Sequence, residues 1–138
     1  MKITADTNLL LRAILEDDPA QATEAQTLIA RAEVIAIPVP VFCEMVWTMR
    51  RLYKRPVEDI ANAIEALLQV ETVATDRPAV EAGIDVLRRG GDFADGAIAW
   101  HGMTLGGTVL ATFDRAAIRV LESARLPAAE PRNLLSEN

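Results

Sequence analysis

Short apolar runs that alternate with longer helical patterns constrain the fold of this chain more than any other feature. Four runs have the length and β-branched content of strands, and a short fifth strand is expected after Pro127. The four runs cover residues 1–5, 34–37, 70–73 and 108–112. Because strands that alternate with helices lie parallel in a sheet, we expect an α/β fold with helices on both faces of a short parallel sheet.

Helical patterns fill the segments between these runs. Pro19, Pro40 and Pro56 each stand where a helix can begin, since proline suits the first helical turn. Glycine pairs at 90–91 and 106–107 end two of the later helices. We expect one helix directly after Asp6-Thr7-Asn8, and others over about 19–32, 40–53, 56–68, 76–90, 92–104 and 114–124.

Composition limits the class of protein. A chain of 138 residues, 51% of them hydrophobic, is expected to fold as one domain spanning residues 1–138. Its one cysteine, Cys43, excludes internal disulfides and a cysteine-based zinc site, and fits a reducing cytoplasm. The single Lys before the first acids predicts no signal peptide, and no apolar run reaches the roughly 18 residues that a membrane span needs.

The net charge is -6, which by itself argues against a nucleic-acid partner. The distribution weakens that argument, because four basic residues fall within 50–55 and Arg88 and Arg89 form a second pair. If several acids bind divalent cations, the remaining charge is close to balanced. The charge therefore decides neither for nor against nucleic acid.

Four acidic residues stand where an apolar stretch meets a turn or a helix start: Asp6, Glu44, Asp95 and Asp114. Asp6 and Asp114 both follow strands, and ligands of parallel sheets bind beyond the carboxyl ends of the strands. Carboxylates are costly in apolar surroundings unless they are paired, protonated or bound to a cation. If the fold gathers these four, their repulsion calls for a metal ion.

Each acid also has an ordinary structural interpretation. Asp6, Asp92 and Asp114 are suitable helix N-caps. The negative charge of Asp95 would be favourable near the positive end of a helix dipole. Asp92 and Asp95 are three residues apart and share a helix face, where Ala99 leaves room for a ligand. Spacing places Glu44 beside Thr48 and Arg51 and opposite an apolar face of Val41, Met45, Met49 and Leu52, which favours a plain polar stripe.

The order of these motifs resembles that of the PIN-domain nucleases. Ala5-Asp6-Thr7-Asn8 opens the pattern, Glu44 follows in a helix after the second strand, and Asp92-Phe93-Ala94-Asp95 and Ala111-Thr112-Phe113-Asp114-Arg115 complete it. The compact bacterial toxins of the VapC type are the most similar group. This resemblance implies a three-layer α/β/α fold and an acidic quartet of Asp6, Glu44, Asp95 and Asp114 around one or two Mg²⁺ or Mn²⁺ ions.

The resemblance also implies supporting roles. Asp92 would be an auxiliary metal-site acid, and Asn8 and Thr112 would support the site. Gly96 departs from the pattern, since relatives more often carry Ala there, and it is expected to loosen its helix by about 1 kcal/mol. No role is transferred to His101.

Hydrolysis by a metal-activated water follows from such a site. The RNA backbone would be held by Arg51, Lys54 and Arg115, with Arg50 and Arg55 as further candidates, although a solvated charged face explains any one of them equally well. The resemblance implies an RNA substrate, a small antitoxin protein and a homodimer. The helices around 20–32 and 40–53 are candidate contact surfaces.

Two other functions fit the sequence. The chain is either a PIN-fold nuclease that acts in RNA processing outside a toxin pair, or a non-catalytic α/β interaction module whose acids are caps. An aspartate-nucleophile phosphatase is disfavoured, because Asp6-Thr7-Asn8 lacks a second Asp two residues after the first.

Overall fold

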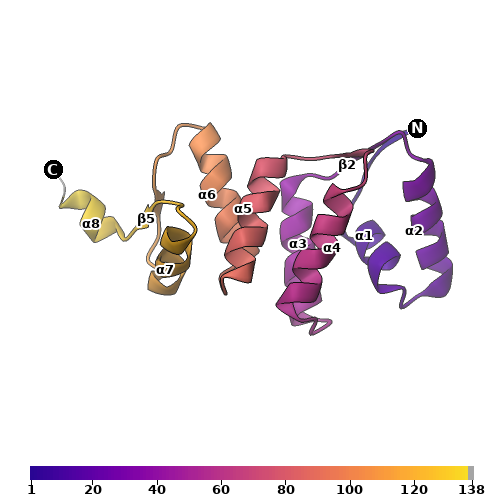
Figure 1. Ribbon diagram of the computed structural model, residues 1–138, viewed down its shortest axis with the longest axis horizontal. Helices are drawn as coiled ribbons and strands as arrows, with labels where there is room; N and C mark the ends of the chain where they lie inside the picture. Colours follow the sequence, from indigo (N-terminus) through magenta and orange to yellow (C-terminus); the bar gives the residue numbers. More distant parts are fainter. Residues whose placement is uncertain (137–138) are drawn as a thin grey trace. The chain divides into compact units, whose positions relative to one another are not determined.

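The computed structural model describes residues 1–136, which divide into two compact units between Asp76 and Arg77. Unit 1 comprises residues 1–76, and unit 2 begins at residue 77. Figure 1 colours the chain from indigo at the N-terminus, through magenta, to yellow at the C-terminus. The alternation of strands and helices predicted from the sequence is confirmed in both units.

Unit 1 contains a parallel sheet of three short strands in the order β1-β2-β3. The strands are β1 (Lys2–Thr4), β2 (Val34–Ala36) and β3 (Val73–Ala74). Ile35 lies at the centre of the ladder, opposite Ile3 on one side and Val73 on the other. The third strand begins later than the predicted run 70–73, because the amide of Val73 closes a turn on the carbonyl of Val70 at 3.0 Å.

Four helices connect these strands: α1 (Thr7–Leu15), α2 (Pro19–Arg31), α3 (Val39–Arg51) and α4 (Val57–Leu68). Their buried faces recur at helical spacing, as in Phe42, Met45 and Met49 of α3, which are at most 2% exposed. Leu52, expected on the same face, is 66% exposed. That expectation was wrong because α3 ends at Arg51, so Leu52 is its C-cap and leaves the helical face.

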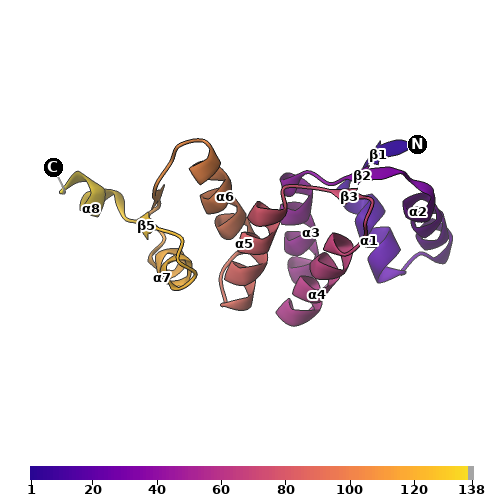
Figure 2. The same ribbon diagram turned by 45° about the horizontal axis from the view of Figure 1, so that its top comes forward.

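Unit 2 begins with two helices, α5 (Arg77–Arg88) and α6 (Phe93–Thr104), which pack side by side (Figures 1 and 2). Two buried glycines allow this approach. A Cβ added at Gly83 would lie 2.6 Å from the Phe93 ring, and one added at Gly96 would lie 2.6 Å from the carbonyl oxygen of Ala82. The expectation that Gly96 merely loosens its helix was therefore incomplete, since a larger residue there would push α5 and α6 apart.

The rest of unit 2 is β4 (Leu110–Ala111), α7 (Arg115–Ser123), β5 (Ala128–Ala129) and α8 (Pro131–Leu135). β4 and β5 pair in parallel as a separate two-stranded sheet. β4 is shorter than the predicted run 108–112, because its partner strand is only two residues long. The predicted final strand after Pro127 is confirmed, whereas α8 was not foreseen.

An apolar cluster holds these parts of unit 2 together. Val86 of α5, Leu121 of α7, Leu126 before β5 and Ala128 in β5 are each at most 5% exposed and pack together. Within residues 1–136, no helix combines the length and the apolar character that crossing a membrane requires.

Candidate functional site

The first predicted acids of unit 2 lie at the start of α6. Asp92 is the N-cap of this helix, and its Oδ1 accepts a hydrogen bond from the amide of Ala94 at 3.1 Å. Asp95 lies in the first turn, where the unpaired amides of a helix carry partial positive charge. The capping interpretation of Asp92 is thus confirmed, and a cap leaves the second carboxylate oxygen available to another ligand.

Asp95 is half-buried, and its surroundings disfavour the charged form of its carboxyl group. Burial raises its pKa above the ordinary value, and the negative charges of Asp92 and Asp114 raise it further. The three carboxylates therefore lie close enough in unit 2 for the charge of two of them to act on the third. A bound cation would relieve this repulsion, since hard divalent cations prefer carboxylate oxygens.

Asp114 is positioned by its neighbours at the end of β4. Its Oδ1 accepts a hydrogen bond from the amide of Ala117 at 3.0 Å, which makes it the N-cap of α7. Its own amide donates to Oγ1 of Thr112 at 3.1 Å, and the amide of Thr112 donates to the carbonyl of Ala129 at 3.1 Å. Thr112 thus links the β4–β5 pair to the backbone of Asp114.

Asp6 occupies the equivalent position in unit 1, directly after β1. The amide of Ala5 continues the ladder to the carbonyl of Ala36 at 2.9 Å, and Oδ1 of Asp6 then accepts from the amide of Leu9 at 2.9 Å as the N-cap of α1. Asp6 and Asn8 line a hollow of about 320 Å³ between α1 and α2.

Glu44 is exposed on α3, on the side away from buried Met45 and Met49. The predicted polar face is confirmed. Asp6 and Glu44 belong to unit 1, whereas Asp92, Asp95 and Asp114 belong to unit 2.

The donor atoms have the right chemistry for a divalent cation, but their arrangement is incomplete as a binding site. Among residues 1–136, no group of three or more His, Cys, Asp or Glu side chains converges closely enough to hold a metal ion. The prediction of the five acids as metal ligands therefore rests on their chemistry and their order along the chain. It stays a prediction.

The basic residues predicted to hold RNA differ in their surroundings. Arg51 lies in the last turn of α3, and Lys54 is exposed in a left-handed conformation with φ of 54°. Arg115 is already paired, because its Nε lies 2.7 Å from Oε1 of Glu130. The hydrogen bond to Glu130 raises the pKa of Arg115. Sequence reasoning missed this pair, since nothing in the spacing connects positions 115 and 130.

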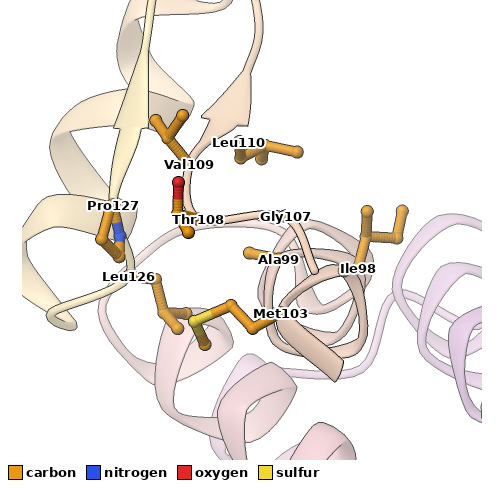
Figure 3. Close-up of a pocket in the computed structure, with 10 residues that line it drawn as sticks. Ile98, Ala99, Met103, Gly107, Thr108, Val109, Leu110, Leu126 and Pro127 are labelled. Carbon is orange, nitrogen blue, oxygen red and sulfur yellow. The ribbon is translucent and has the colours of Figure 1, made fainter. Parts of the chain in front are cut away.

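A separate pocket in unit 2 is apolar. It encloses about 110 Å³ beside α6, the loop before β4 and the start of β5 (Figure 3). Ile98, Met103, Val109 and Leu126 are among its lining side chains, and no carboxylate lines it. Its chemistry therefore does not suit a metal site.

The sequence model of the PIN domain matches residues 3–122 of this chain. The chain therefore belongs to the PIN-domain family, whose members are generally nucleases that use divalent metal ions. The match spans both units and includes all five predicted acids. The eight helices and short parallel strands of residues 1–136 agree with the three-layer α/β/α fold of the family. No curated protein matches the chain.

Proposed function

We propose that this protein is a metal-dependent endoribonuclease, the toxin of a type II toxin–antitoxin pair of the VapC type. The observation that carries the proposal is the half-buried Asp95, whose pKa is raised by burial, by Asp92 and by Asp114. A carboxylate with a perturbed pKa beside two others is typical of a functional site. Membership of a nuclease family gives this cluster its proposed chemistry.

The proposal assigns Mg²⁺ or Mn²⁺ to the acidic residues. Asp6, Glu44 and Asp95 serve as ligands, directly or through water, Asp114 serves an outer or second metal position, and Asp92 assists. Such an ion, when bound, supplies an activated water as the nucleophile and offsets the negative charge that develops on the phosphate. Thr112 fixes the backbone of Asp114, and Asn8 is a polar neighbour of Asp6 on α1.

RNA binding falls to basic residues outside the acidic cluster. A chain with a net charge of -6 binds RNA more weakly when no cation neutralises some of its acids. Arg51 and Lys54 are exposed and hold the flanking phosphates. Arg115 contributes as well, either while it keeps its ion pair with Glu130 or after that pair opens. The likeness to toxins supports three further parts of the proposal: a small antitoxin partner, a homodimer and a cytoplasmic location.

The deciding experiment is cleavage of total RNA by the purified chain, with Mn²⁺ or Mg²⁺ and with EDTA. We expect cuts at a small number of sites with either ion and none in EDTA. Asp95→Asn should slow cleavage by at least a hundredfold, because it removes a charged ligand without changing the size of the side chain. Asp59→Asn is the matched control, since Asp59 is an exposed acid on α4 outside the predicted site.

The same experiment separates the alternative functions. If Asp6→Asn and Asp95→Asn cleave RNA as fast as the parent and bind Mn²⁺ as tightly, the acids are only caps and the nuclease proposal fails. Cleavage that stays unchanged when the product of a small neighbouring gene is added would instead favour a nuclease outside a toxin pair.

A further inference from the structure

The hollow between α1 and α2 has the construction of a small binding site. Its floor is apolar, with Ala25 3% exposed and Leu9 and Leu28 half-buried. Its volume of about 320 Å³ is at the lower end of the range for small-molecule pockets, roughly 300–1,000 Å³. Figure 2 shows the two helices that form its walls.

Hydrogen bonds within and between α1, α2 and the turn that joins them hold these walls together. Nε2 of Gln26 on α2 donates to the carbonyl of Ala13 at 3.0 Å and to Oε1 of Glu16 at 2.8 Å. Nη1 of Arg12 donates to Oδ1 of Asp17 at 2.9 Å. This hydrogen bond raises the pKa of Arg12, whose side chain also lines the hollow. These contacts connect α2 and the turn before it to the end of α1.

The rim of the hollow is polar and open. Asn8, Gln21 and Glu24 are exposed, and Gln21 and Glu24 are three residues apart on the same face of α2. Asp6 completes the rim. Arg12 also lines the hollow, but its charge is paired with Asp17, so the remaining charges of the lining are the carboxylates of Asp6 and Glu24. These disfavour a free anion as the occupant. A flat, neutral ring with hydrogen-bonding edges matches an apolar floor with a polar rim.

We propose that the α1–α2 hollow binds the base of the nucleotide next to the cleaved phosphate, and that Glu24 selects guanine. This inference rests on the proposed function, because the metal ion proposed at Asp6 would then hold that phosphate at one end of the hollow. A carboxylate accepts two hydrogen bonds side by side. Guanine offers the matching pair, its ring N1–H and its 2-amino group, whereas adenine, cytosine and uracil each place an acceptor beside their donors. The amides of Gln21 and Asn8 are able to donate to the other edge.

The test is the base preference of cleavage. The parent and Glu24→Gln are incubated with a pool of single-stranded RNA of random sequence, and the cut ends are sequenced. Hexaribonucleotides built on the preferred site then carry guanine, inosine or adenine at the flanking position. We expect the parent to favour guanine by about tenfold to a hundredfold in kcat/KM, mainly through KM, because the contact forms on binding. Inosine, which lacks the 2-amino group, should lie between guanine and adenine.

Glu24→Gln should lose this preference while keeping metal-dependent cleavage. Thr27→Ala, on the same helix but outside the hollow, and the charge-matched Asp59→Asn should keep the preference of the parent. Binding of the same hexamers in EDTA, followed by fluorescence anisotropy, should show the same order of bases without any cleavage.

The outcomes separate the two proposals. If the parent does not cleave RNA with either ion, the proposed function fails, and the anisotropy order in EDTA still decides on the hollow. If the parent cleaves without preferring guanine, or Glu24→Gln keeps that preference, the hollow does not read the base and the nuclease proposal stands.

Discussion

The two units of this chain differ in the surroundings of Asp6 and Asp95 and in their glycine content. In unit 1, exposed Asp6 caps α1 through the amide of Leu9, which stabilises the start of the helix. In unit 2, Asp95 is half-buried, and its pKa is raised by burial and further by the charges of Asp92 and Asp114. All seven glycines of the chain also lie in unit 2. Unit 2 thus combines close helix packing with a charge cluster that lowers its own stability.

This contrast indicates where function constrains the sequence. Carboxylates with perturbed pKa values gather at functional sites, where their charge is used. The glycines at the contact between α5 and α6 fix the position of the helix that carries two of these acids. Substitutions at three places test the contrast between the units.

The largest effect is expected at the contact between α5 and α6. Gly83→Ala and Gly96→Ala should each destabilise the protein by about 1–3 kcal/mol, because an added Cβ would meet Phe93 or the carbonyl of Ala82. Gly102→Ala is the matched control, since nothing lies within 4 Å of its added Cβ. It should stabilise α6 by about 1 kcal/mol through helix propensity. Urea unfolding measures all three, and equal effects would refute the packing argument.

A smaller effect is expected at the cap of α1. Asp6→Ala should cost about 1 kcal/mol in the free energy of unfolding, because the amide of Leu9 loses its acceptor. Asp6→Asn should be close to neutral, since asparagine caps equally well. Both variants are measured in EDTA to exclude metal effects. Similar losses in the two variants would show that the charge, rather than the cap, stabilises unit 1.

The smallest effect is expected at Asp95, where a substitution should raise the stability of the protein instead of lowering it. Its raised pKa means that the folded state holds the proton more tightly than the unfolded state, so stability falls as the pH rises through that pKa. In EDTA, Asp95→Asn should therefore have a slightly higher Tm than the parent at neutral pH. The difference should vanish below the unfolded-state value of about 3.9. A lower Tm for the variant at neutral pH would contradict the repulsion.

Much of the fold followed from local patterns in the sequence. The cap positions of Asp6, Asp92 and Asp114 were predictable because an N-cap depends on residues a few positions apart. The ends of β3 and β4, and the exposure of Leu52, depend instead on where a turn, a partner strand or a helix terminus falls. The close-packing role of Gly96 depends on a neighbouring helix, which no spacing within α6 reveals.

The candidate site was predictable to a lesser extent. Motif order singled out the acids, and the structure adds the electrostatic effect of Asp92 and Asp114 on Asp95. The pairing of Arg115 with Glu130 and the hollow beside Asp6 arise from contacts between separate elements. In the sequence, the pair is visible only as one acid, Glu130, before a proline, and the hollow only as an ordinary polar face of α2. Neither pattern differs from what a helix or a loop of no special function would show.

The β4–β5 pair has a practical consequence for anyone who shortens this protein. The family match ends at residue 122, which suggests a natural place to trim the chain. Trimming there would remove the carbonyls of Pro127 and Ala129, which accept from the amides of Leu110 and Thr112. It would also remove Glu130, the partner of Arg115. The residues after position 122 therefore stabilise the loop that positions Asp114. A shortened protein should retain them.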